Sequence, residues 1–440
     1  MTVSHLKFRT EQLTVANAGR SGVLDVRLYG ATALAGSAHI GNTVADQVQR
    51  LSANTTTVAF DLLSIALAVT AADSFIQRNA LGENGWARDF DIELPLVNPN
   101  TWQPVKERLE HALHFLSGDT WNFTFLSGGR NRPSAMQTHK KRIANLAGVD
   151  CVSLFSGGLD SWIGVNNLLR NKRVPILVSH AYTGDRKYQN ALFPTFKGRA
   201  ERFAVNASPM RQFSGHDTTM RTRSFNFVAF AAVAAEAISE LNRTSAKVPL
   251  YVPENGFIAL NAPLTPRRVG TLSTRTTHPH YLSELQAIFD AVGIRAQLEN
   301  PYRHKTKGQM LKDFSPGPSE IGAAMNTVSC GKWKRKGIQC GHCVPCIIRK
   351  SAFFAAGISD TTNYGWTLQQ AIAHDNVHTK DDVMSMAFAV SPSKPTDLTK
   401  RALASGPLPL EAVERQGWFD VHHQGLYEVA DYLRSEGVIS

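Results

Sequence analysis

The hexapeptide Ser156-Gly157-Gly158-Leu159-Asp160-Ser161 contains residue types that can hold a phosphate group. It follows an apolar run at 149–155 (VDCVSLF) that predicts a strand, and it precedes the apolar spacing of a helix. Glycines let the backbone approach an anion, and the amides at a helix N-terminus present donors and the positive end of the helix dipole. The Asp160 carboxylate can hold Mg²⁺ against phosphate oxygens. The pattern predicts a nucleotide site, and the alternative is an ordinary strand-to-helix turn.

Four of the five cysteines are close together in the sequence, with the spacing C-x9-C-x2-C-x2-C. They are Cys330, Cys340, Cys343 and Cys346. Four thiolates at these spacings can close a tetrahedral Zn²⁺ site with no open position, which would make the zinc ion structural. His342 is inside the loop and could replace one thiolate, and a set of unrelated buried thiols is the alternative. The spacing therefore predicts a structural zinc site.

Polar residues at the start of a predicted helix (278–292) could recognise a substrate. A guanidinium there could hold a carboxylate through two hydrogen bonds, and the hydroxyls could contact the edge of a heterocycle. The residues concerned are Arg275, Thr276, Thr277 and His278. Alternatively Thr277 caps the helix, and His278 is either a general base or a capping or structural histidine. Glu254 and Asn255 follow an apolar strand, so we expect them at the sheet edge where substrates bind.

From residue 149 onward, predicted strands and helices alternate. The strand at 149–155, the helix at 160–170 and the strand at 174–182 form a βαβ unit. Further helices are predicted at 187–204, 224–241, 278–292 and from about 306, with a strand at 248–252. This order predicts an open α/β fold with a parallel sheet, in which ligands bind beyond the carboxyl ends of the strands.

Two further regions flank this α/β part of the chain. The first contains predicted strands at 24–29, 90–97 and 120–126, helices at 60–77 and 102–116, and a linker at 127–134. The second, after residue 358, has helical periodicity. We therefore predict an α+β accessory module at 1–148, an α/β domain at 149–358 and a helical tail at 359–440.

Composition and charge restrict the class of protein. Hydrophobic residues make up 43% of the chain and charged residues 19%, which allows a sizeable core. No apolar run approaches the roughly 18 residues of a membrane span and no signal peptide is evident, so we expect a cytoplasmic protein without a membrane partner. The net charge of +11 arises from two stretches without acidic residues, 120–149 and 321–359. These stretches suit an anionic partner, or they are simply solvated faces.

The hexapeptide and the cysteine motif together resemble the QueC family of PP-loop (N-type) ATP pyrophosphatases, over about residues 149–355. The resemblance implies an adenine nucleotide alpha hydrolase-like domain that binds ATP, Mg²⁺ and Zn²⁺ and adenylates a 7-deazaguanine carboxylate. The implied nucleotide contacts are the hexapeptide residues with Tyr182 and Arg223, and the implied catalytic residues are Asp160, Lys307 and Arg275. The segment 254–278 differs from that of a housekeeping QueC, so the candidate substrate contacts rest on residue type and position alone: Glu254, Asn255, Arg275, Thr276, Thr277 and His278.

The long flanking regions resemble the QatC family, the QueC-like components of Qat anti-phage defence systems. This resemblance implies that the activated deazaguanine is transferred as an amide to a partner protein encoded in the same defence operon. The alternatives are a housekeeping 7-cyano-7-deazaguanine synthase and a PP-loop tRNA-modifying enzyme. Nucleic acid is the less favoured partner, because the basic run at 332–336 is tied to the cysteine loop.

Overall fold

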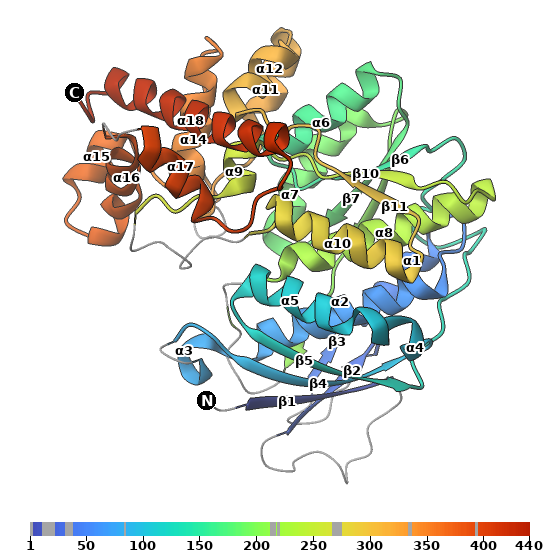
Figure 1. Cartoon of the computed structure of the whole chain (residues 1–440). Helices are drawn as coiled ribbons and strands as arrows, with labels where there is room; N and C mark the ends of the chain where they lie inside the picture. The colour runs from blue at the N-terminus through green and yellow to red at the C-terminus, as the bar shows by residue number, and fades with distance from the viewer. Residues whose placement is uncertain are drawn as a thin grey trace.

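The computed structural model describes residues 3–10, 23–30, 38–82, 85–211, 217, 221–265, 275–332, 337–391 and 395–440. In this part of the chain, helices separate two β-sheets, and a group of C-terminal helices lies beside the second sheet (Figure 1). The predicted α/β class is confirmed. Three residues of the predicted basic run lie outside the described residues: Lys334, Arg335 and Lys336.

The first sheet has six strands in the order β5-β4-β1-β2-β3-β9. They are β1 (Val3–Arg9), β2 (Val23–Leu28), β3 (Ala38–Ile40), β4 (Asp89–Leu96), β5 (Thr120–Ser127) and β9 (Met210–Arg211). All pairs are parallel except β3 with β9. β2, β4 and β5 confirm the three strands predicted in this region. β9 comes from the α/β part of the sequence, so the first sheet is not built from residues 1–148 alone.

The helices of this region are α1 (Val44–Gln49), α2 (Thr57–Phe75), α3 (Arg78–Leu81), α4 (Pro99–Trp102) and α5 (Lys106–Ser117). The helix predicted at 60–77 corresponds to α2. The single helix predicted at 102–116 is wrong at its start, because a 3-10 turn at Gln103–Val105 separates α4 from α5. Pro104 lies in that turn, where its missing N–H costs no helical hydrogen bond.

The second sheet has five parallel strands in the order β11-β10-β6-β7-β8. They are β6 (Cys151–Leu154), β7 (Pro175–His180), β8 (Glu201–Val205), β10 (Val248–Tyr251) and β11 (Ala296–Glu299). Every residue of β6 and β7 is buried, as expected for central strands covered on both faces. The helices around it are α6 (Leu159–Arg170), α7 (Thr183–Leu192), α8 (Arg223–Asn242), α9 (Gly256–Leu260), α10 (Pro279–Val292), α11 (Lys307–Phe314) and α12 (Pro318–Met325).

The helix predicted at 187–204 is wrong in its second half. α7 ends at Leu192, and Glu201–Val205 form the edge strand β8. Phe203 and Val205 are buried while Ala204 between them is partly exposed, which is the period of a strand rather than a helix. The error arose because a short strand offers too few residues to distinguish the two periods.

α2 and α8 pack against each other between the two sheets, and their side chains belong to one continuous hydrophobic core. Thr55, just before α2, donates a hydrogen bond to the carbonyl of Val233 in α8 (3.0 Å). Both helices are long and apolar enough to cross a membrane, but 94% and 83% of their most apolar windows are buried inside the protein. This burial is typical of core helices in a soluble protein. The core crosses the domain boundary predicted at residue 148.

The remaining helices are α14 (Val344–Ala355), α15 (Leu368–Ala373), α16 (Val377–Val390), α17 (Pro395–Leu403) and α18 (Ala412–Ser435). They pack around a separate apolar cluster that includes Ile347, Leu426 and Leu433. α18 also contacts α9, which follows β10 of the second sheet. The C-terminal helices therefore reach the end of the sheet where ligands bind in open α/β folds.

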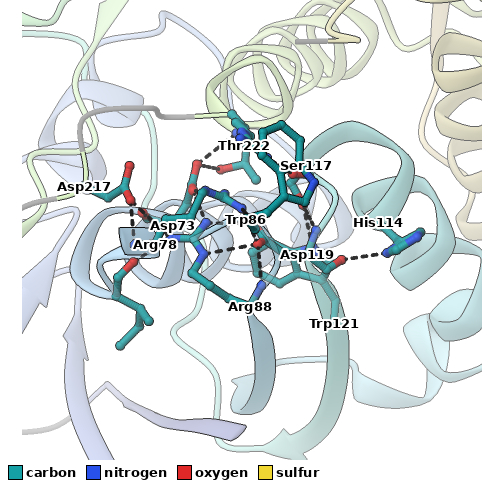
Figure 2. A network of polar contacts seen from close by, with 12 residues as sticks. Asp73, Arg78, Trp86, Arg88, His114, Ser117, Asp119, Trp121, Asp217 and Thr222 are labelled. Carbon is teal, nitrogen blue, oxygen red and sulfur yellow. Dashed lines mark hydrogen bonds and ion pairs between the residues drawn. The ribbon is translucent and has the colours of Figure 1, made fainter. Parts of the chain in front are cut away.

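A buried network of charges joins α2 and α3 to the residues just before β4 and β5 (Figure 2). Arg78 donates two hydrogen bonds to the Asp119 carboxylate (2.7 and 2.9 Å), and Arg88 bridges Asp119 (2.8 Å) and Asp73 (2.5 Å). Burial alone would raise the pKa of Asp119, but the two guanidinium groups lower it overall. Both arginines are about 2% exposed, so each depends on its carboxylate partners for compensation.

We expect Asp119→Asn to destabilise the fold by about 3–5 kcal/mol, because it leaves buried guanidinium charge without compensation. Denaturant unfolding of the full chain measures the effect. Asp91→Asn is the matched control in the neighbouring strand, since Asp91 contacts His5 at the surface and should cost less than about 1 kcal/mol. Equal losses in the two variants would contradict a structural role for the buried network.

Candidate active site and cysteine cluster

The carboxyl ends of the parallel strands bring the predicted site residues to one edge of the second sheet. The hexapeptide follows β6, and Glu254 and Asn255 follow β10. β6 lies between β7 and β10, so the strand order reverses at this point. Such a reversal opens a crevice between the loops that leave neighbouring strands, which is where open α/β sheets bind ligands.

The backbone of the hexapeptide forms a tight turn into α6. Gly157 has a φ of +84°, and a Cβ there would come within 2.6 Å of the Tyr188 ring, so only glycine fits. The Gly158 amide donates to Ser156 Oγ (3.2 Å), and Ser161 Oγ donates to the Gly158 carbonyl (2.9 Å). α6 begins after Gly158 with no side chain capping it. Its first amides are therefore available to an anion.

Asp160 lies 4% exposed in the first turn of α6, and both of its carboxylate oxygens accept hydrogen bonds. Its Oδ2 accepts from the backbone amide (3.0 Å) and the side-chain amide (2.7 Å) of Asn255. Its Oδ1 forms an ion pair with Lys307, the first residue of α11. The structure therefore brings together three predicted residues that are far apart in the sequence.

Neighbouring groups hold Asp160 in its ionised form. Burial would raise the pKa of Asp160, but the Lys307 charge and hydrogen bonds from Glu254 and Asn255 lower it to about 2. Burial and the nearby Asp160 charge raise the pKa of Glu254 well above its ordinary value. The surroundings therefore favour the ionised form of Asp160 and the protonated form of Glu254 beside it.

Local structure explains why Lys307 reaches this site. The amide of Gly256 donates to the Lys305 carbonyl (2.8 Å), and a Cβ at Gly256 would lie 1.9 Å from the Arg303 carbonyl oxygen. Only glycine permits this close approach between the start of α9 and the loop before α11. Thr306 then caps α11 through a capping box with Gln309, which fixes Lys307 at the first helical position.

Tyr182 and Arg223 lie together at the end of β7. The Arg223 guanidinium is 5.2 Å from the centre of the Tyr182 ring and forms an ion pair with Asp185. It also approaches Nε2 of His180 at 2.6 Å. Asp185 and His180 are both about 5% exposed. Sequence reasoning missed both, although they stand in the same SHAYTGD segment as Tyr182.

The structure does not bring the predicted segment 275–278 to Asp160. Arg275 lies over the Phe115 ring (4.4 Å) and donates to the Phe115 carbonyl (3.3 Å). His278 caps α10: its Nδ1 accepts from the His280 amide (3.2 Å), and its Nε2 is 3.1 Å from Ser405 Oγ. The capping alternative is therefore correct for His278, which is the N-cap, and wrong for Thr277. The side-chain hydrogen bonds of Arg275 and His278 to described residues go to Phe115, His280 and Ser405, and none goes to Glu254, Asn255 or the hexapeptide.

We expect His278→Asn to remove part of the pH dependence of stability. Burial, and then the charges of Arg275 and His280, lower the pKa of His278 to about 3. The pKa of a histidine in an unfolded chain is about 6.5. Between pH 7 and pH 5 the unfolded chain therefore takes up a proton at this position, and the folded chain does not. Stability should thus fall by about 2 kcal/mol more in the parent protein than in the variant. Asparagine can still cap the helix. Unfolding curves at pH 7 and pH 5 measure the loss of stability, and an equal loss in the parent protein and the variant would contradict this expectation.

The four predicted cysteines form a buried cluster, with all four Sγ atoms within 4.8 Å of one another. The Cys340–Cys346 and Cys330–Cys343 sulfur pairs are each 3.9 Å apart. Zn–S bonds of about 2.3 Å in a tetrahedron place sulfurs about 3.8 Å apart, so the cluster fits Zn²⁺. Backbone amides of Lys332 and Cys340 donate to Cys330 Sγ (3.3 Å each), as outer-shell donors do at thiolate sites. The cluster does not need His342.

The cysteine loop contacts the hexapeptide directly. Val328 precedes Cys330 by two residues, and its amide donates to the Gly157 carbonyl (3.1 Å). Gln339 connects this stretch to the cluster by donating to the Thr327 carbonyl (3.1 Å) and accepting from the Ser329 amide (3.0 Å). A metal bound by the cysteines would therefore also hold the wall of the candidate nucleotide site.

The basic stretch at 321–359 is not a uniform cationic surface. Arg349 is fully buried and donates to Thr327 Oγ1 (2.7 Å) and the Ala324 carbonyl (3.0 Å). Lys332 forms an ion pair with Asp382 (3.1 Å), and Lys350 lies over the Tyr364 ring (4.4 Å). These three basic residues therefore stabilise the fold around the cysteine loop, and an anionic partner for this stretch stays a prediction.

The fold and site define an α/β protein with a glycine turn that leads into α6, a buried carboxylate–lysine pair and a four-cysteine cluster. No family model matches the chain. Over 72 residues the chain is 38% identical to a 7-cyano-7-deazaguanine synthase of Syntrophobacter fumaroxidans. The match covers 16% of this chain and 29% of that relative, so the chain spans less than a third of the relative's length. This partial similarity supports a QueC-like relationship.

Proposed function

We propose that this protein is a QueC-like enzyme that uses ATP to adenylate a 7-deazaguanine carboxylate. The observation that carries the proposal is the meeting of Asp160, Lys307 and Asn255 beside the turn at Gly157 and Gly158. The similarity to a 7-cyano-7-deazaguanine synthase and the cysteine cluster support the same reading.

In the proposed reaction, the loop amides and the start of α6 bind the phosphates of ATP. A carboxylate oxygen of the substrate attacks the α-phosphorus, the bond to the bridging oxygen breaks, and pyrophosphate leaves. Mg²⁺ held by Asp160 would neutralise phosphate charge, and Lys307, already beside Asp160, would share that task. Because Asp160 stays ionised, the site is ready to bind a cation over the whole neutral range.

An amine then attacks the adenylate carbonyl, so a C–N bond forms, AMP leaves and the amine loses a proton. We propose that this amine belongs to a partner protein in anti-phage defence, on the basis of the resemblance to the QatC family. The first sheet and the C-terminal helices supply surface for such a partner. A housekeeping 7-cyano-7-deazaguanine synthase is the second candidate, because the curated relative carries that name.

One set of incubations tests both candidates. The full chain is mixed with ATP, Mg²⁺ and 7-carboxy-7-deazaguanine, with either ammonia or the protein encoded beside it. Pyrophosphate release that depends on the deazaguanine supports the adenylation step, and its absence under all conditions contradicts it. A mass increase on the neighbouring protein supports transfer in defence. Efficient conversion of the free deazaguanine with ammonia instead identifies the housekeeping reaction.

A further inference from the structure

A cavity of about 430 Å³, away from the hexapeptide, lies where three distant parts of the chain meet; it is called the second cavity below. One wall is Trp86 with the end of α5 and Gly118, the second is the stretch after α9 with Arg275, and the third is Ala404 and Ser405 after α17. Arg221, just before α8, completes the lining. Among the described residues, no lining residue belongs to the hexapeptide or contacts Asp160.

Two arginines give this cavity its chemistry. The Arg221 guanidinium lies 3.7 Å from the centre of the Trp86 ring and donates to the Ser117 carbonyl (3.0 Å). Arg275 makes the same two kinds of contact with Phe115: its guanidinium lies over the ring and donates to the backbone carbonyl. Each guanidinium has five N–H donors, and these contacts use one of them. Within the part of the chain that the structure describes, neither arginine forms an ion pair.

Neighbouring groups compensate only part of the positive charge of Arg221 and Arg275. Both acceptor carbonyls belong to the last turn of α5, whose helix dipole amounts to about half a negative charge. Asp119 and Asp73 also favour the Arg221 charge, whereas Arg78 and Arg88 oppose it. Burial lowers the pKa of Arg221 to about 10 and also lowers the pKa of Arg275, which shows that the protein interior disfavours both charged forms. A bound anion would supply the missing partner.

The buried charge network of the first sheet holds the cavity wall in place (Figure 2). Arg78 donates to the Trp86 carbonyl, and Thr222, next to Arg221, donates to Asp73 through its amide (3.0 Å) and hydroxyl (2.9 Å). Ser117 accepts from the Asp119 amide (3.1 Å). The rings and carbonyls on which the guanidinium groups lie are therefore fixed before any ligand binds.

We propose that this cavity binds a small organic anion, one that carries a carboxylate or a phosphate on an apolar or planar body. The free donors of the two guanidinium groups suit either anion, because arginine forms paired hydrogen bonds with both. Leu116, Pro263 and the ring edges offer apolar contact for the body of the ligand. The volume is within the range of small-molecule sites, roughly 300–1,000 Å³. The inference does not depend on the proposed ATP reaction, and it gives Arg275 a role away from the ATP phosphates.

Titration of the full chain with benzoate and with phenyl phosphate tests the proposal and distinguishes the two anion types. Calorimetry gives the affinities, and Trp86 fluorescence, obtained by difference from a Trp86→Phe variant, shows whether the probe enters the cavity. Arg221→Gln and Arg275→Gln should each weaken binding of the preferred probe at least tenfold. Arg130→Gln is the matched control, since Arg130 also lies over a ring and donates to a backbone carbonyl but is outside the cavity.

A second variant keeps the test decisive if an arginine variant misfolds. Ala404 is exposed and lines the cavity, so Ala404→Trp should block the probe without disturbing the core. Excess ATP should leave probe binding unchanged. The proposal is overturned if neither probe shows saturable binding, if the Arg130 variant loses as much affinity as the others, or if ATP displaces the probe.

Discussion

Asp160→Asn should lower the rate of pyrophosphate release by at least about 1,000-fold, the scale of losing a charge that stabilises a phosphoryl transition state. Asp160 is the ionised carboxylate at the candidate site, and Glu254 beside it favours its protonated form. Asparagine keeps the size of the side chain, and its amide oxygen can still accept from Asn255, but it loses the charge and the ion pair with Lys307. The measurement is the initial rate of pyrophosphate formation with ATP, Mg²⁺ and the deazaguanine carboxylate.

Two further variants separate catalysis from folding. Asp160→Asn alone leaves the buried Lys307 ammonium without its partner, which should cost several kcal/mol of stability. The double variant Asp160→Asn, Lys307→Met removes both charges and should recover most of that stability while staying inactive. Asp313→Asn at the exposed Lys305 ion pair is the control and should retain full activity. Pyrophosphate release within tenfold of the parent rate in Asp160→Asn would contradict the assignment.

The parts of the site that the sequence predicted are those whose signal is local. The hexapeptide and the cysteine spacing each lie within one short segment, so residue type and spacing are sufficient to recognise them. The partnership of Asp160 with Asn255 and Lys307 depends on three different strand ends, and without the resemblance to QueC nothing in the chain indicated Lys307. Its position follows from the close approach at Gly256, which only a folded structure can show.

The second cavity and the charge network could not be predicted, because their members come from distant segments. Asp73, Arg88 and Asp119 each appear as ordinary charged residues in the sequence. Only the packing of α2 against β4, which pairs with β5, buries them together. Arg221 and Trp86 are likewise separated by more than a hundred residues, and no periodicity relates them.

The shared core changes how transfer to a partner protein can be tested. Residues 1–148 contribute α2, which covers apolar side chains of α8 between the sheets. Deletion of that region would expose a mostly buried helix and would be expected to unfold the α/β part as well. Surface substitutions in the intact chain are therefore the appropriate way to locate a partner site.

Cys343→Ser should abolish zinc binding and weaken ATP binding at least tenfold, although Cys343 lies outside the hexapeptide. Structural zinc sites contribute about 10–16 kcal/mol of apparent binding energy in zinc-finger peptides, and that energy is coupled to local folding. Here the cysteine loop includes the Val328 amide that donates to the Gly157 carbonyl. Loss of the metal should therefore loosen the turn that faces the nucleotide. Elemental analysis, thermal unfolding and ATP titration of the full chain measure the three effects.

The fifth cysteine provides the matched control for this prediction. Cys151 is buried in β6 and is not part of the four-cysteine cluster, so Cys151→Ala should keep about one zinc ion per chain and the parent affinity for ATP. A structural role also predicts that chelation lowers ATP affinity as much as the Cys343 variant does. If the variant loses zinc but binds ATP as the parent protein does, the cysteine loop does not support the nucleotide turn. If it retains zinc, the four thiolates are not the ligand set.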